Sequence, residues 1–144
     1  MDPSEQYEKD CRKIKKHNAL LLKEFATSLE QKNLTEKTIK KHCSNLDFYI
    51  NEFLLYEEAI EAEKGSGYIG DFLGYWFIRK AMWASAASIR ENASSLKIFY
   101  QFMHQNGKIS KESLAEMKQT IKQDMPEWIA TVKKYDNPEI DDIW

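Results

Sequence analysis

Two stripes of polar and basic side chains have the residue types and spacing that suit a definite chemistry. One stripe contains Lys37, Lys41 and Ser44, with Lys40 at its edge, and the other contains Arg90, Ser94, Lys97 and Gln101. Steps of three and four residues place the members of each stripe on one face of an α-helix. Such donor-rich faces allow a helix to lie along the phosphates of a nucleic acid. A plain solvent-exposed face fits the same spacing.

Metal chemistry has weaker support in the sequence. The possible ligands are Cys11, His17, His42, Cys43 and His104. No pair among them has the C-x-x-C or H-x-x-x-H spacing of a metal site, and the adjacent His42 and Cys43 point about 100° apart on a helix. We therefore expect no metal site and no cofactor.

Gly65, Gly67 and Gly70 spell G-x-G-x-x-G, the pattern that holds a dinucleotide between a strand and a helix. The residues before it, 57–64, are acidic and helical in pattern, and the sequence has no runs typical of buried parallel strands. We interpret the match as chance. The sequence also lacks a Walker loop, a G-x-S-x-G elbow and an H-E-x-x-H motif. Asp47 and Asp71 have ready structural roles, so we expect the protein not to be an enzyme.

A helix across 34–56 must position the first stripe. Thr35 is a good N-cap, flanked by the staple pair Leu34 and Ile39. The apolar side of this helix is formed by Ile39, Cys43, Leu46, Ile50 and Phe53. Its second half is apolar nearly all round, through Phe48, Tyr49, Leu54, Leu55 and Tyr56. That pattern predicts a buried C-terminal half and an N-terminal half with its lysines in solvent.

Four further helical patterns complete the chain. They cover about 6–31, 68–80, 85–105 and a region from Ser110 onward, in which Pro126 should produce a kink or a break. With no alternating strand pattern, the sequence predicts an all-α fold of about five helices. We expect one domain over 1–135 and a frayed acidic tail over 136–144.

Composition narrows the class of protein. The 144 residues are 42% hydrophobic, enough for one compact core. Two cysteines and a start without the basic and apolar order of a secretory signal favour the cytoplasm. The sequence contains no long uncharged apolar run, so we expect no membrane-spanning helix. The net charge of −2 does not indicate a general nucleic-acid binder, so any such activity must depend on a local patch.

Two blocks of this sequence resemble signature helices of one known family. Residues 33–42, NLTEKTIKKH, with Leu46 and Phe53 after them, form the first block, and WASAASIRENASSLKIFYQFMHQNGKI, from Trp83 to Ile109, forms the second. Both are similar to helices of the N-terminal core-binding domain of tyrosine recombinases, or phage integrases, a SAM-like fold. The resemblance covers about 18–125 and implies a compact orthogonal helical bundle that closes on duplex DNA. Carried over by position, the DNA-binding residues are Lys37, Thr38, Lys40, Lys41, Ser44, Arg90, Ser94 and Lys97.

The departures from that family concern catalysis. Strand breakage there belongs to a separate C-terminal domain with a nucleophilic tyrosine and several arginines. The present sequence has only Arg12, Arg79 and Arg90 and ends before such a domain, so we expect no recombinase chemistry. The expected partners are duplex DNA and possibly a full-length recombinase or another protein, without a membrane or a small-molecule substrate.

A second hypothesis keeps the helical bundle but gives it a different partner. A protein-interaction or regulatory domain that has lost DNA binding would use exposed aromatic residues, for instance Phe48, Trp83 or Trp144. It would also carry an exposed apolar patch larger than a few hundred Å² and lysines neutralised by neighbouring acids.

Overall fold

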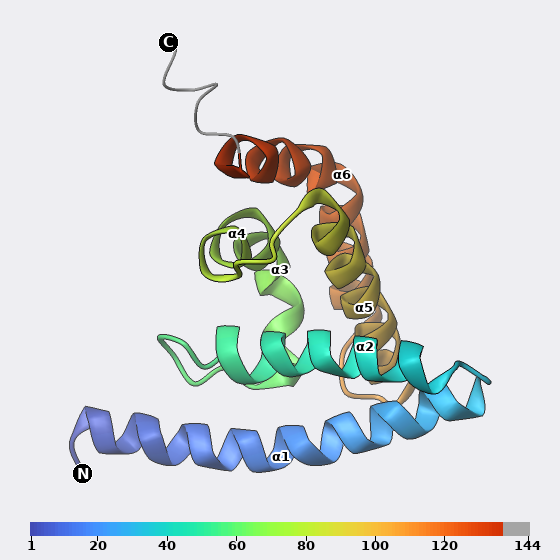
Figure 1. Cartoon of the computed structure of the whole chain (residues 1–144). Coiled ribbons are helices and arrows are strands. Elements are labelled where there is room, and N and C mark those ends of the chain that lie inside the picture. The colour runs from blue at the N-terminus through green and yellow to red at the C-terminus, as the bar shows by residue number, and fades with distance from the viewer. Residues whose placement is uncertain (137–144) are drawn as a thin grey trace.

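The computed structural model describes residues 1–136, and this part consists of helices joined by turns and short loops, with no strand (Figure 1). Consecutive helical segments group into five regions of the described chain, which are 3–31, 36–53, 62–80, 86–105 and 111–136. The prediction of an all-α fold is therefore confirmed. The tail expected over 136–144 lies outside the described residues except for Asp136, which is the last residue of helix α6.

The first two helices form an antiparallel pair (Figure 1). Helix α1 spans Pro3–Gln31 and begins where the Asp2 carboxylate accepts a hydrogen bond from the Glu5 backbone N–H at 2.9 Å. Asn33, with a φ of 62°, reverses the chain. Helix α2 spans Glu36–Asp47, and Thr35 Oγ1 accepts from the Thr38 N–H at 3.2 Å, which confirms the predicted N-cap.

The second half of the predicted central helix differs from an α-helix. It continues α2 as the π-helical segment η1, Phe48–Phe53, whose wider turns pack more backbone into the same length. Tyr49, Ile50, Leu54 and Leu55 are buried, as expected from the apolar pattern. The expectation is wrong for Tyr56, which is exposed because the helical path ends at this point and the chain turns away.

The region predicted as one helix over 68–80 is a series of short segments that begins earlier. It consists of η2 (Ala62–Tyr68, 3-10), α3 (Ile69–Asp71), η3 (Phe72–Trp76, π) and α4 (Phe77–Lys80). Phe72, Leu73, Phe77 and Ile78 are buried. The aromatic stripe of this region therefore belongs to the core, as its spacing indicated.

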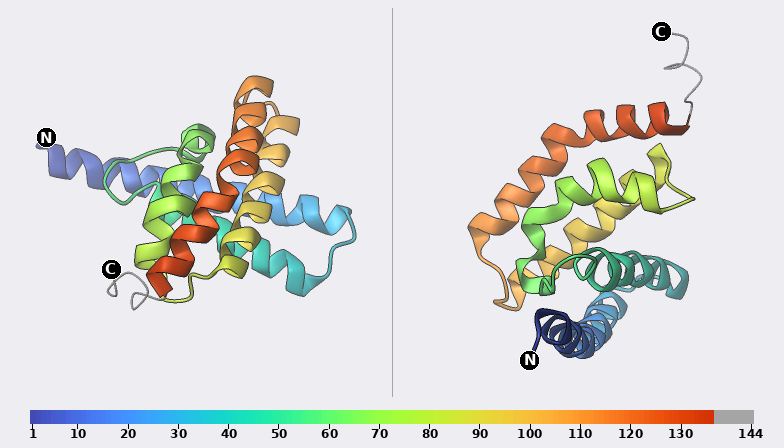
Figure 2. Two further views of the ribbon diagram at one scale, coloured as in Figure 1. Left: turned by 90° about the horizontal axis from the view of Figure 1, so that it is seen from above. Right: turned by 90° about the vertical axis from the view of Figure 1, so that its left-hand side faces the viewer.

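The last two helices form a second antiparallel pair that crosses the first at a steep angle (Figures 1 and 2). Helix α5 spans Ala86–Gln105 between a Ser85–Ser88 capping box and Gly107, whose φ is 71°. Helix α6 spans Lys111–Asp136, after Ser110 Oγ accepts from the Ser113 N–H. Figure 2 shows α6 turning along its length, and Pro126 inside it removes one backbone donor, which agrees with the predicted kink.

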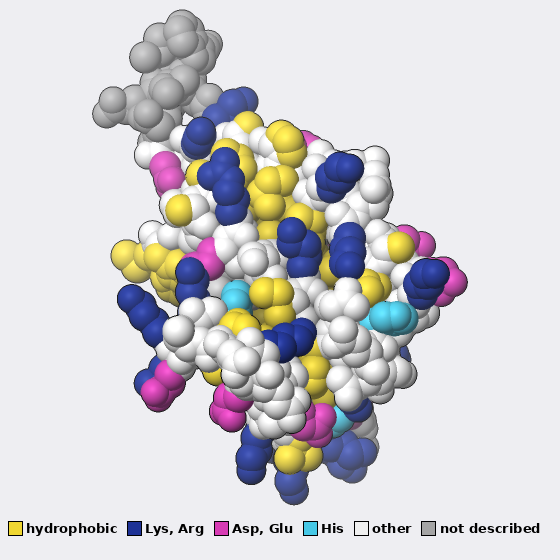
Figure 3. All heavy atoms as spheres, turned by 90° about the vertical axis from the view of Figure 1, so that its right-hand side faces the viewer, with side chains coloured by type: hydrophobic (Ala, Val, Ile, Leu, Met, Phe, Trp, Pro, Cys, Tyr) yellow, Lys and Arg dark blue, Asp and Glu magenta, His cyan; other side chains and the backbone are white. Residues whose placement is uncertain are grey.

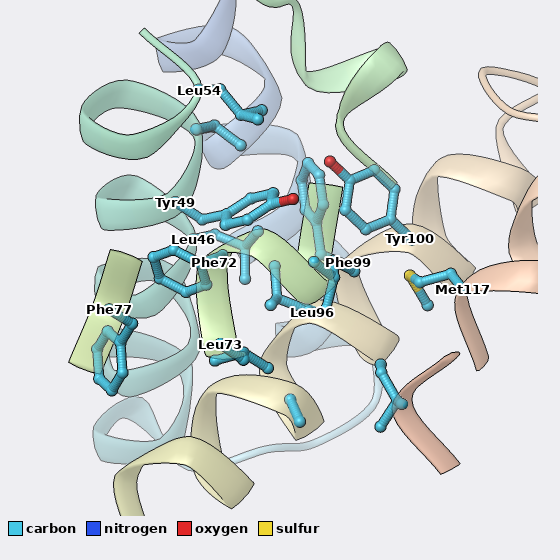
Figure 4. Close-up of a cluster of buried hydrophobic side chains, with 14 of the residues drawn as sticks. Leu46, Tyr49, Leu54, Phe72, Leu73, Phe77, Leu96, Phe99, Tyr100 and Met117 are labelled. Carbon is cyan, nitrogen blue, oxygen red and sulfur yellow. The ribbon is translucent and has the colours of Figure 1, made fainter. Parts of the chain in front are cut away.

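Two buried tyrosines tie the core to segment η2 (Figure 4). The Tyr49 hydroxyl donates to the Gly65 carbonyl at 2.6 Å, and the Tyr100 hydroxyl donates to the Ala62 carbonyl at 2.8 Å. A Cβ on Gly65 would lie 2.4 Å from the Tyr100 hydroxyl oxygen. Gly65 therefore has a packing role in the core.

Candidate nucleic-acid interface

Helices α2 and α5, which carry the two predicted stripes, pack directly against each other. Beneath the stripes, His42 Nδ1 lies 2.7 Å from Ser95 Oγ, and Asn45 Nδ2 donates to the same oxygen at 3.0 Å. His42 is only 8% exposed. Burial lowers the pKa of His42, and the neighbouring Lys41 charge lowers it further. The ring is therefore neutral near pH 7, and this polar cluster fixes the position of α2 relative to α5.

An ion pair joins the two helices at the surface. The ammonium group of Lys41 in α2 contacts the carboxylate of Glu91 in α5. Glu91 is the neighbour of Arg90, so this contact brings the predicted stripes of α2 and α5 together. It also places an acid within the candidate interface that the spacing argument did not include, and it partly neutralises Lys41.

Of the other residues predicted to bind DNA, all but Thr38 have exposed side chains. These exposed residues are Lys37, Lys40, Ser44, Arg90, Ser94 and Lys97. Thr38 differs, because it is half-buried and its hydroxyl is hydrogen-bonded to Thr35 Oγ1 at 2.9 Å. Its place in the N-cap gives Thr38 a structural role. Gln101, at the far end of the α5 stripe, accepts from the Lys118 ammonium at 2.9 Å and is held toward α6.

The charge on one side of the molecule is visible in Figure 3, which shows the right-hand side of Figure 1. Lys and Arg side chains are spread over this side, and Asp and Glu side chains lie mostly toward its edges. Hydrophobic side chains fill the spaces between them. A local excess of positive charge can exist in a chain of net charge −2 where basic side chains outnumber acids such as Glu91 on one side of the molecule.

The exposed aromatics of the alternative hypothesis lie beside the end of the α2 stripe. Trp83, in the turn before α5, is 59% exposed, and the adjacent Met82 is fully exposed. Phe48 is half-buried, with its ring centroid 5.4 Å from that of Trp83. Trp144 lies outside the described residues.

Two structural features are absent from residues 1–136. No group of three or more His, Cys, Asp or Glu side chains there is arranged to hold a metal ion. No helix in the same range combines the length and apolar character needed to cross a lipid bilayer.

Comparison of the chain with protein-family models, with curated proteins and with solved structures finds no match. The resemblance of the two sequence blocks around α2 and α5 to the recombinase core-binding domain stays a prediction.

Proposed function

We propose that this protein binds duplex DNA through α2 and α5, in the manner of a recombinase core-binding domain and without a strand-breaking step of its own. The observation that carries the proposal is the direct packing of α2 against α5. It places on adjacent helices two stripes that were selected separately in the sequence, around residues 37–44 and 90–97. The Lys41–Glu91 ion pair lies between these helices and weakens the contribution of Lys41 to phosphate binding. Two adjacent helices with exposed donors can follow the phosphates of neighbouring turns of a duplex.

The chemistry of this surface suits the DNA backbone better than a particular base sequence. Its cations are Lys37, Lys40, Lys41, Arg90 and Lys97, and Ser44 and Ser94 add exposed hydroxyl donors. Lysine is a flexible point charge, whereas the planar guanidinium group best suits bidentate reading of a guanine edge, and Arg90 is the single arginine among these residues. We therefore expect binding dominated by phosphate contacts, with strong salt dependence.

The location of the interface can be tested by NMR titration of the ¹⁵N-labelled protein with a short duplex at low salt. The proposal predicts amide shift changes concentrated in 36–44 and 88–98. Changes concentrated in α1 or in the second half of α6, both of which also carry exposed lysines, would contradict it. A spectrum without any change would contradict it as well.

A second candidate function is supported by the Met82–Trp83 turn. A fully exposed methionine beside an exposed tryptophan is unusual in a soluble domain and is typical of protein-binding surfaces. In this alternative the protein docks on another protein through the turn, and the lysine surface serves solubility. Replacing both residues with serine would abolish binding to such a partner and leave DNA affinity unchanged.

A further inference from the structure

A cavity of about 350 Å³ opens between the chain leaving η1 and the α3–η3 segment. Aromatic rings form much of its wall: Tyr56, Tyr68, Tyr75, Trp76 and Phe53. The Tyr56 and Trp76 rings meet nearly at a right angle, at 69° with centroids 5.6 Å apart, and Phe53 meets Trp76 at 63°. Rings inclined in this way do not stack on one another, and Tyr56, Tyr68 and Tyr75 remain exposed to solvent.

The polar part of the wall is acidic. Glu57, Glu58 and Asp71 line the cavity, and all three side chains are exposed. Among the described residues, none of the side chains in this wall is basic. A ligand inside would therefore face three negative charges in addition to the negative faces of the aromatic rings.

The same rings already attract cations from this chain. The Arg79 guanidinium lies 3.8 Å from the centroid of Tyr75, and the Lys80 ammonium lies 4.9 Å from that of Tyr56. Lys80 Nζ also donates a hydrogen bond to the Tyr56 hydroxyl at 3.0 Å. Neither Arg79 nor Lys80 belongs to the residues that line the cavity.

The three carboxylates of the wall do not converge as metal ligands do, since no group of three or more His, Cys, Asp or Glu side chains within 1–136 is arranged to hold a metal ion. Aromatic faces instead favour large, weakly hydrated cations that lose little hydration when they enter.

We propose that this cavity binds an organic cation of the alkylammonium class, with a methylated nitrogen seated against the rings and balanced by the three carboxylates. This ammonium group can come from a free small molecule or from a methylated lysine side chain of a partner protein. The inference is independent of DNA binding, because none of its residues belongs to α2 or α5.

The test uses calorimetric titration of the whole protein with choline and, in parallel, with 3,3-dimethylbutan-1-ol. The alcohol has the same shape, with carbon in place of the charged nitrogen. We expect saturable choline binding at least about tenfold tighter than binding of the alcohol. Equal affinities, or no saturable choline binding, would overturn the proposal.

Charge-matched variants locate the site. The double change Glu58→Gln and Asp71→Asn should weaken choline binding at least about threefold and leave binding of the alcohol unchanged. The control double change Glu112→Gln and Glu127→Gln removes two exposed acids from α6 and should have no effect. Equal loss in both variants would contradict a local site.

A third titration identifies the source of the cation. A short peptide with one trimethyllysine should bind more tightly than choline if the natural ligand is protein-borne, and no more tightly if it is a free molecule. The same peptide with unmodified lysine should bind more weakly than the methylated one, and the reverse order would contradict the preference for a methylated nitrogen.

Discussion

His42 in α2 and Ser95 in α5 are 53 residues apart in sequence, yet the Nδ1 atom of the first lies 2.7 Å from the Oγ atom of the second. Because Asn45 Nδ2 donates to the same oxygen, the Ser95 proton is free to be donated to the neutral ring. The contact is buried between the two helices that carry the candidate interface. The Ser95 hydroxyl therefore links α2 to α5, in addition to the packing of the two helices and the Lys41–Glu91 ion pair.

Substitution Ser95→Ala should lower the free energy of unfolding by about 1–3 kcal/mol, since it leaves the buried His42 nitrogen and the Asn45 amide without this partner. Urea denaturation measures the change. The matched control is Ser94→Ala at the next position, which is exposed and should remain within about 0.5 kcal/mol of wild type. Equal effects of the two changes would show that the Ser95 hydroxyl does not join the helices.

Stability should depend on pH through His42. Folding lowers the pKa of His42, mainly by burial and further through Lys41, so near its ordinary pKa of about 6.5 the unfolded chain binds more protons than the folded one. The stabilisation that comes from a neutral, buried His42 is therefore fully present above pH 6.5 and is lost as the pH falls below this value. Urea midpoints between about pH 7.5 and pH 5.5 should therefore fall less in a His42→Gln variant than in wild type. Parallel pH profiles for the two proteins would contradict this account.

Substitution Gly65→Ala should destabilise the fold. The added methyl group would lie 2.4 Å from the Tyr100 hydroxyl oxygen and 2.6 Å from a Leu54 methyl carbon, inside the core. The expected cost is about 1–3 kcal/mol in thermal or urea unfolding. Gly67→Ala is the control, because a Cβ there meets no atom within 4 Å. A Gly65→Ala variant as stable as the Gly67→Ala variant would mean that η2 can move away from the tyrosine.

Substitution Glu91→Gln should tighten DNA binding at low salt about two- to fivefold, because it frees Lys41 to contact a phosphate. Fluorescence anisotropy with a labelled duplex measures the change. Glu127→Gln alters the net charge equally on the exposed surface of α6 and should have a smaller effect. Equal gains in the two variants would indicate that only net charge matters.

Local sequence signals predicted the helices better than the contacts between them. Thr35, Ser85 and the Asn106–Gly107 stop each act within a few residues, and the structure places helix ends there. The π-helical turns at Phe48–Phe53 were not predicted, because apolar side chains on all sides fit α and π geometry alike. The choice between them depends on how neighbouring rings such as Phe72 and Trp76 pack against this segment.

The candidate interface was also predicted in part: the exposure of its side chains followed from local spacing, whereas the contacts between its helices did not. Helical spacing correctly identified most of its exposed side chains, such as Lys37 and Arg90. It could not show that Glu91 would meet Lys41, since these residues are 50 positions apart and their contact depends on how α5 lies on α2. Thr38 was assigned to the interface by resemblance alone, and its hydroxyl is instead bonded to that of Thr35.

The most direct test of the central claim is an anisotropy titration of labelled duplex DNA at several salt concentrations. It compares wild type with Lys37→Ala/Lys41→Ala/Arg90→Ala and with the control Lys111→Ala/Lys122→Ala/Lys134→Ala, which removes three exposed cations from α6. Circular dichroism should show wild-type helix content and melting in both variants.

We expect saturable wild-type binding whose log K falls by roughly 0.9 per neutralised phosphate for each tenfold rise in salt. The interface variant should bind at least about tenfold more weakly, with a salt slope smaller by up to about 3, while the α6 variant stays close to wild type. Absence of binding by the wild-type protein at low salt, or an equal loss in the two folded variants, would contradict a DNA-binding surface on α2 and α5.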